Sequence, residues 1–218
     1  MGNSATDCRA IFGDDSSIYT GFEYYMHRDM VRGGAVKIAN DNDRGPFITT
    51  YTGRFYPFNP RASEVNIYDI AHALSMQCRY SGHGARFYSV AEHSVLVARE
   101  VAKTAPADAL AGLLHDAPEA LSGFGDIASP VKKRVALIED VEDGIFDAVA
   151  EFAGIAPIIP AIVHEIDARI TADEMAENLH ECPVMHEPLG VTLHYWSPAV
   201  AEAEFLRMWN MLAGGKPQ

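Results

Sequence analysis

The sequence predicts an all-α fold in which helices form one compact bundle. From Asn66 onward, apolar residues recur at helical spacing, beginning with Ile67, Ile70 and Leu74 on one face. No stretch shows the sustained alternation of apolar and polar residues that half-buried strands require. With 218 residues, of which 48% are hydrophobic, the chain is long enough to bury one sizeable core.

Residues 1–60 differ in character from the rest of the chain. They are rich in Gly, Asp, Asn and Tyr, show no sustained period, and end in a segment with Pro57 and Pro60. We therefore expect residues 1–60 to form an irregular N-terminal extension and residues 61–218 to form the helical domain.

Start signals place the first helices of the domain. After the stripe that begins at Ile67, Ser89 and Glu92 have the form of a capping box, which puts His93 in the first turn of the next helix. Pro106 marks the start of a third helix. Pro118 should kink that helix, because its ring clashes with the carbonyl four residues earlier and it lacks an amide donor.

The remaining helices follow from two longer stripes and a final start signal. The stretch from Cys182 to Trp196, broken by Pro183 and Pro188, predicts a loop, and Ser197 with the following proline starts the last helix. The inward positions expected on these helices are Ile138, Val141, Ile145, Val149 and Phe152; Ile162, Val163, Ile166 and Ile170; and Ala201, Phe205, Met208 and Leu212.

Composition excludes several classes of protein. The formal charge of −13 argues against binding long nucleic acid, which needs many cationic contacts, but allows a small anionic substrate in a local cationic pocket. Cys8, Cys78 and Cys182 form no CxxC pair, so neither a disulfide framework nor a thiolate zinc site is expected. The apolar stretch 152–163 is too short to span a bilayer. With no secretory signal, we expect a cytoplasmic protein without a membrane partner.

Two adjacent ligand-type residues carry the chemistry. His115 and Asp116 lie in an otherwise apolar helix, with Leu113, Leu114 and Ala117 around them. A buried charge needs a partner, and a metal ion would supply one. The alternative is a polar pair that faces solvent.

Asp167 and His93 extend this set. Asp167 lies between Val163 and Ile170 on its helix and has no Lys or Arg three or four positions away. If they are not metal ligands, Asp167 is an exposed aspartate at the edge of the apolar stripe, and His93 is an ordinary core or surface histidine. Two imidazoles with two carboxylates suit a divalent Mn, Fe, Co, Ni or Zn ion rather than calcium, and Mg is kept as a further candidate.

These residues resemble a known pattern. His93, the His115–Asp116 doublet and the distant Asp167 are similar to the H…HD…D motif of the HD superfamily of metal-dependent phosphohydrolases. Glu119 and the segment 125–132 extend the likeness, over roughly residues 50–180, to the HD-domain 5′-deoxynucleotidases of bacteria and phages. One departure is the stretch 122–125, which is longer than its counterpart in those enzymes. The resemblance implies an HD-domain helical bundle.

The resemblance also implies roles for individual residues. His93, His115, Asp116 and Asp167 would hold the cation, which lowers the pKa of water and polarises a phosphoryl oxygen. Glu119 would orient or deprotonate the attacking water, and Asp126 would protonate the leaving oxygen. The alternative for Glu119 is an ordinary exposed helix carboxylate, and the alternative for Asp126 is an N-cap of the following turn.

Substrate binding is expected from cations beside aromatic rings. Arg79 and Tyr80 are similar to the Arg–aromatic pair that contacts phosphate and excludes a 2′-hydroxyl in the deoxynucleotidases. Arg86, His83 and Lys132 are further candidates for the phosphate. The alternative for His83 is an ordinary loop histidine, and the alternative for Lys132 is a solvated surface lysine.

The expected function is removal of phosphate from 2′-deoxynucleoside 5′-monophosphates. The nearest alternative is hydrolysis of deoxynucleoside triphosphates to nucleoside and tripolyphosphate. A di-iron oxidation, which would recruit His164 or Glu119 as extra ligands, and a non-catalytic nucleotide sensor are weaker alternatives. The expected partners are a small nucleotide and further copies of the same chain.

Overall fold

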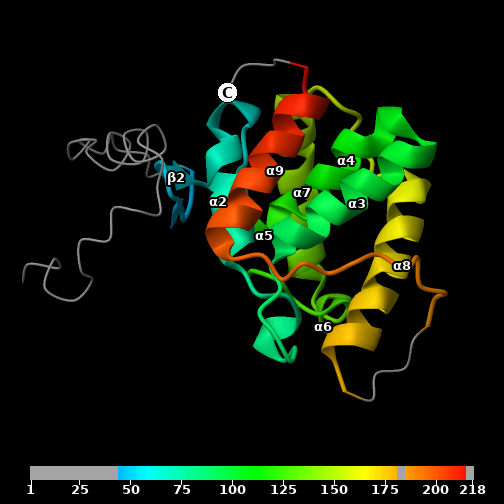
Figure 1. The fold of residues 1–218 in the computed structure, drawn as a ribbon. Coiled ribbons are helices and arrows are strands. Elements are labelled where there is room, and N and C mark those ends of the chain that lie inside the picture. Colours follow the sequence, from blue (N-terminus) through cyan, green and yellow to red (C-terminus); the bar gives the residue numbers. More distant parts are fainter. Residues whose placement is uncertain (1–43, 181–184, 215–218) are drawn as a thin grey trace, which may run out of the picture. The chain divides into compact units, whose positions relative to one another are not determined.

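The computed structural model describes residues 44–180 and 185–214. In these residues the all-α prediction is confirmed, because nearly all regular structure is helical (Figure 1). The α-helices are α2 (Ile67–Met76), α3 (Val90–Thr104), α4 (Ala109–Leu114), α5 (Ala117–Leu121), α6 (Ser129–Lys132), α7 (Ala136–Ala153), α8 (Ala161–Asn178) and α9 (Pro198–Leu212). Short 3-10 helices are η2 (Ala62–Glu64), η3 (Arg79–Gly82) and η4 (Pro106–Asp108).

The described part of the expected N-terminal extension, residues 44–60, packs onto the helical core. Residues 44–60 include an antiparallel hairpin of β1 (Ile48–Thr49) and β2 (Arg54–Phe55), and Phe55 is 1% exposed in the main core. Strands of two residues are too short to show an alternating pattern, which explains why the sequence did not reveal them. Residues 1–43 of the expected extension lie outside the described residues.

The hairpin is attached to α2 through one buried carboxylate. Asp69 accepts hydrogen bonds from the Thr50 hydroxyl at 2.7 Å and from the Thr52 amide at 2.6 Å. Tyr51 stacks on His72 of the same helix, with ring centroids 4.0 Å apart. These contacts fix the turn of the hairpin against the helical domain.

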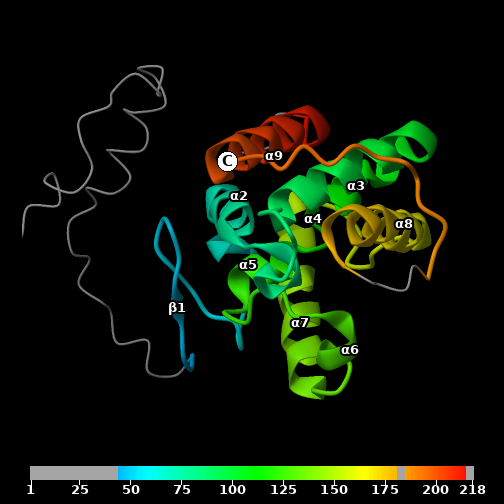
Figure 2. The same cartoon turned by 60° about the horizontal axis from the view of Figure 1, so that its bottom comes forward.

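Helix α3 is central to the packing. It contacts α2, α4, α8 and α9, and both views show these helices around it (Figures 1 and 2). The expected stripes are buried at most positions, including Val141, Ile145 and Val149 of α7 and Phe205 of α9. Burial of these stripes against α3 and its neighbours holds the bundle together.

The helix that carries His115 and Asp116 is interrupted as expected. Helix α4 ends at Leu114 and α5 begins at Ala117, with Pro118 in the first turn of α5. A proline there is tolerated because the first amides of a helix have no partner within it. His115 and Asp116 therefore lie at the junction between two short helices and not within one continuous helix.

The capping box is only half formed. The Ser89 hydroxyl accepts from the Glu92 amide at 3.1 Å, as predicted, but the Glu92 carboxylate does not complete the box. It accepts instead from the backbone amides of His194, Tyr195 and Trp196 at 2.6 to 3.0 Å. These distant amides provide the hydrogen bonds that the buried Glu92 carboxylate needs, whereas the sequence analysis expected it to bind the start of its own helix.

Residues 185–196 cross from α8 toward the start of α9 without regular structure (Figure 1). Besides Glu92, Asp173 anchors this segment by accepting from the amides of residues 189, 190 and 191 at 2.9 to 3.4 Å. The loop that was predicted for 182–196 is therefore observed in its described part, 185–196. Within 44–180 and 185–214, no helix combines the length and apolar character needed to cross a bilayer.

Candidate metal centre

Three of the predicted ligands converge at one point. His93 comes from the first turn of α3, and His115 and Asp116 come from the break between α4 and α5. Their nearest ligand atoms all lie within 4.8 Å of one another. The Nε2 atoms of the two histidines are 3.3 Å apart, and an Asp116 oxygen is 3.4 Å from Nε2 of His115.

Asp167 joins this group from α8. Its Oδ1 lies 3.0 Å from Nε2 of His93, and its side chain is one-third exposed. Burial alone would raise the pKa of this carboxyl, but the hydrogen bond from His93 and the charges of His93, His115 and Arg79 hold the pKa well below its usual range. Asp167 is therefore an anion beside the two imidazoles, although it is not within the compact three-residue group.

The buried carboxylate Glu174 was missed by the sequence analysis. It accepts from Nδ1 of His93 at 2.6 Å, from Nε of Arg79 at 3.0 Å and from the Tyr80 hydroxyl at 2.5 Å. Asp167, Thr171 and Glu174 are spaced i, i+4 and i+7, so they share one face of α8. A second acidic residue two turns after Asp167 was the available signal.

Electrostatics in this cluster favour positive charge on His93. Its burial and the neighbouring Arg79 lower its pKa, but Glu174 and Asp167 outweigh both and raise the pKa to about 10. Glu174 stays ionised, since Arg79 and His93 overcome the effect of burial and bring its pKa to about 2. The centre therefore attracts a cation between its imidazoles and carboxylates.

Glu119 lies beside this group in α5. It is buried, one oxygen lies 3.3 Å from Nζ of Lys132, and the other has no hydrogen-bond partner within the described part of the chain. Burial and the negative charges of Asp116 and Asp126 raise its pKa to about 9. Nζ of Lys132 also lies 2.8 Å from a carboxylate oxygen of Glu142. Glu142 is a second acidic residue that the sequence analysis missed.

Asp126 and the predicted substrate pair are also connected. An Asp126 oxygen accepts from the Tyr80 amide at 2.8 Å, whereas the residue that caps α6 is Ala128. Tyr80 and Ser81 have φ of 59° and 52°, a left-handed conformation that L residues seldom adopt. Nη1 of Arg79 lies 3.4 Å from an Asp116 oxygen, so the Arg–Tyr pair borders the ligand group.

The other predicted substrate residues lie elsewhere in the loop before α3. His83 and Arg86 are exposed, and the Arg86 guanidinium lies 3.6 Å from the centroid of the Tyr195 ring. Asn178 fixes this loop, because its side-chain oxygen accepts from the Arg86 amide at 2.9 Å. The structure therefore brings Arg79, Tyr80 and Lys132 to the cluster and gives Arg86 an aromatic partner outside it. His164, the possible extra iron ligand, is exposed on α8.

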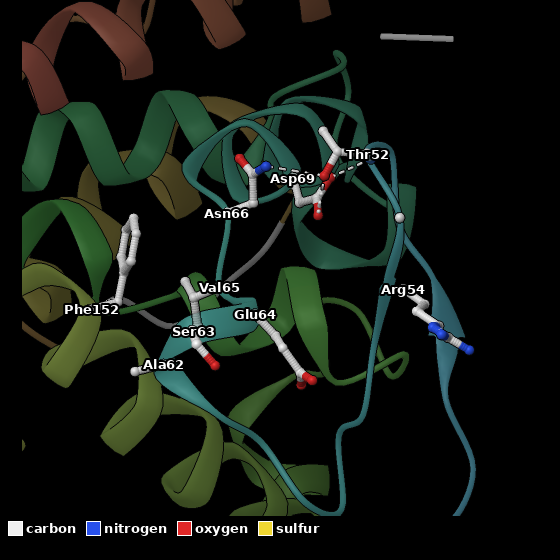
Figure 3. Close-up of a pocket in the computed structure, with 10 residues that line it drawn as sticks. Thr52, Arg54, Ala62, Ser63, Glu64, Val65, Asn66, Asp69 and Phe152 are labelled. Carbon is white, nitrogen blue, oxygen red and sulfur yellow. Dashed lines mark hydrogen bonds between the residues drawn. The ribbon is translucent and has the colours of Figure 1, made fainter. Parts of the chain in front are cut away.

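A separate hollow of about 480 Å³ lies beside the hairpin (Figure 3). Part of its polar lining is engaged within the protein: Asp69 accepts hydrogen bonds from Thr50 and Thr52, and Glu64 pairs with Arg44. No predicted site residue lines it. The chemistry of the His–Asp cluster, rather than the size of this hollow, identifies the candidate site.

The donor set fits a divalent transition metal. It offers two imidazole nitrogens and carboxylate oxygens, and the outer nitrogen of each histidine has an acceptor: Glu174 for His93, and the Gly112 carbonyl at 2.8 Å for His115. Metal-ligating histidines commonly have such an outer partner, which fixes the ring and its tautomer. The His93–His115–Asp116 group is therefore a candidate metal site.

Comparison with known proteins places the chain in a family. No family model matches it. The protein YfdR of Escherichia coli K12 is 35% identical over 129 residues, which cover 59% of this chain and 70% of YfdR. The chain belongs to the YfdR family. Protein RCAP_rcc00048 of Rhodobacter capsulatus, at 34% identity over 132 residues, matches 54% of this chain and 66% of its own length. YfdR and this relative are both named as uncharacterized proteins, so the family membership assigns no activity.

Proposed function

We propose that this protein is a metal-dependent phosphohydrolase of the HD type that removes phosphate from 2′-deoxynucleoside 5′-monophosphates. One observation carries the proposal: His93, His115 and Asp116 present ligand atoms within 4.8 Å of one another, beside the ionised Asp167. A divalent cation held there would polarise a phosphoryl oxygen and make water a better nucleophile near neutral pH.

The chain's own residues supply acid–base groups next to this site. Glu119 has an oxygen without a hydrogen-bond partner among the described residues, so its carboxylate form is the candidate to accept a proton from the attacking water. A cation held at the ligand group would offset the negative charge of Asp116 that helps to raise the pKa of Glu119, and would thereby favour this carboxylate form. Lys132 lies 3.3 Å from Glu119 and 2.8 Å from Glu142, and its positive charge also favours the ionised form of Glu119. Asp126, held by the Tyr80 amide, is the candidate donor of a proton to the leaving oxygen.

Substrate selection is assigned to Arg79 and Tyr80. The Arg79 guanidinium donates through Nε to Glu174 and extends Nη1 toward Asp116, a position that suits contact with a phosphoryl oxygen beside the cation. The Tyr80 ring lies 5.4 Å from that guanidinium and is half-buried. A ring in this place fits against the sugar of a bound nucleotide.

The test is a product assay on protein that has been stripped with a chelator and reloaded separately with Co, Mn, Mg, Ni or Zn. Matched deoxynucleoside mono- and triphosphates are supplied, and Asp116→Ala is the inactive control. We expect orthophosphate from the monophosphates with at least one metal. Tripolyphosphate from the triphosphates would instead support the alternative substrate class. Nucleotide binding without turnover under any metal would overturn the proposed hydrolase in favour of a sensor.

A further inference from the structure

Glu174 connects the candidate metal centre to the substrate side of the site. It is fully buried in α8, and its oxygens accept from His93 on α3 and from Arg79 and Tyr80 on η3. The three donors are 81 to 95 positions away in sequence. One carboxylate therefore contacts a predicted metal ligand and both members of the predicted substrate pair.

The chemistry of a carboxylate determines what these neighbours do. An ionised carboxylate only accepts hydrogen bonds, so each of its three partners must donate. The His93 proton is thereby held on Nδ1. Nε2, the atom that faces His115 and Asp167, is the nitrogen that can give its lone pair to a metal.

We propose that Glu174 is a positioning residue that fixes His93 as an Nε2 ligand and, through the same carboxylate, holds Arg79 and Tyr80 for the substrate phosphate. This inference rests on the proposed function, since it assumes that the centre binds a metal. It adds a residue outside the expected H…HD…D set and makes metal affinity and substrate affinity depend on one side chain.

Asp173 provides a matched control for a merely structural carboxylate. It is the preceding residue on α8, it is also buried, and it accepts from three backbone amides of the segment 185–196. No hydrogen bond in the described structure joins it to the metal cluster. If buried carboxylates on α8 matter only for stability, the amide variants of both residues should behave alike.

The experiment compares the full-length wild type, Glu174→Gln and Asp173→Asn. Glutamine keeps the size of the side chain but offers one accepting oxygen to three donors, and its amide group must face at least one of them. We expect Zn²⁺ and Co²⁺ affinity, measured by competition with a chromophoric chelator, to fall about 10- to 100-fold in Glu174→Gln. The visible spectrum of bound Co²⁺ should change as well, and at saturating metal the KM should rise more than kcat falls.

Asp173→Asn should bind Co²⁺ with the wild-type spectrum and near wild-type affinity, even if it unfolds at a lower temperature. Wild-type metal affinity in folded Glu174→Gln would overturn the inference but leave the proposed function standing. Equal losses of affinity in the two variants, in proportion to their loss of thermal stability, would also overturn it. A wild-type protein that binds neither ion would overturn the proposed function together with this inference.

Discussion

The Nε2 atoms of His93 and His115 face each other at 3.3 Å. Two neutral imidazole nitrogens at this distance must share a proton or a cation, since two lone pairs would repel each other. In the metal-free protein the charge is a proton on His93, because Glu174 and Asp167 raise its pKa to about 10 despite burial. A proton and a metal ion therefore compete for the same space.

Metal-free protein should lose stability as the pH rises from about 6.5 to 10. His93 has a folded pKa above its ordinary value of 6.5, so its contribution is fully present below 6.5 and disappears as the pH approaches 10. The raised pKa of Glu119 acts in the same direction, because ionising this buried carboxyl costs free energy in the folded state only. Each group changes the free energy of unfolding by at most about 1.4 kcal/mol per pH unit.

The measurement is thermal unfolding of chelator-stripped protein between pH 6 and pH 9.5, repeated with saturating Zn²⁺. The zinc-loaded protein should show a smaller decline, because the ion replaces the proton on His93. A metal-free protein that becomes more stable between pH 7 and pH 9 would contradict this assignment of charge.

Removal of Asp116 should abolish metal retention. Its carboxylate is one of three groups in the compact ligand set, and the remaining two imidazoles leave an incomplete coordination shell. Elemental analysis of purified Asp116→Ala, with circular dichroism to confirm folding, tests this. Asp140→Ala, which removes an exposed carboxylate of α7, is the control for the change in charge. Stoichiometric metal in folded Asp116→Ala would exclude Asp116 as a ligand.

Glu119→Gln should bind metal normally but lose most turnover. Glu119 is outside the compact ligand group and has an oxygen without a partner among the described residues, so its proposed role is to act on water. General acid–base groups contribute roughly 100- to 10,000-fold to rate. Metal titration and steady-state kinetics on the same preparation separate the two effects. A near-normal kcat in Glu119→Gln would mean that Glu119 does not act on water and serves only as an ion-pair partner of Lys132.

The sequence predicted features that depend on neighbours along the chain. The Ser89 cap, the break before Pro118 and the buried stripe of α7 all follow from rules that act over one or two helical turns. The convergence of His93 with His115 and Asp116 was expected from the motif. In the structure the ligand atoms of these three residues lie within 4.8 Å of one another.

The features that the sequence did not predict depend on contacts between distant segments. Glu92 was assigned to its own helix end, yet its carboxylate binds amides about a hundred positions later. Glu174 was not predicted as a site residue because an acidic residue on a helix usually faces solvent. Its three hydrogen-bond donors are brought to it only by packing against α3 and η3. The hairpin was missed because its strands are two residues long.

Tyr80 should be the main discriminator between deoxyribose and ribose. Its hydroxyl is bound by Glu174 and its backbone amide by Asp126, so the ring is held from both ends beside Arg79. A ring fixed against C2′ leaves no room for an added hydroxyl and gives it no hydrogen bond. An unpaired hydroxyl costs about 1–3 kcal/mol, or roughly ten- to a hundredfold in selectivity.

Two variants separate the ring from its hydroxyl. Tyr80→Ala should reduce the difference in kcat/KM between deoxy- and ribonucleotides, mainly by allowing the ribonucleotide to bind. Tyr80→Phe keeps the ring and should keep the preference for deoxyribose. The measurement is kcat/KM on matched deoxy- and ribonucleoside monophosphates, and on the triphosphates in case those are the substrates. Equal efficiency on both sugars in the wild type would refute a deoxy-selective site. If the ratio of kcat/KM on the two sugars is unchanged in Tyr80→Ala, the residue that selects the sugar is Phe87 instead, which is 39% exposed. Tyr88 is fully buried and has no surface that could contact a substrate.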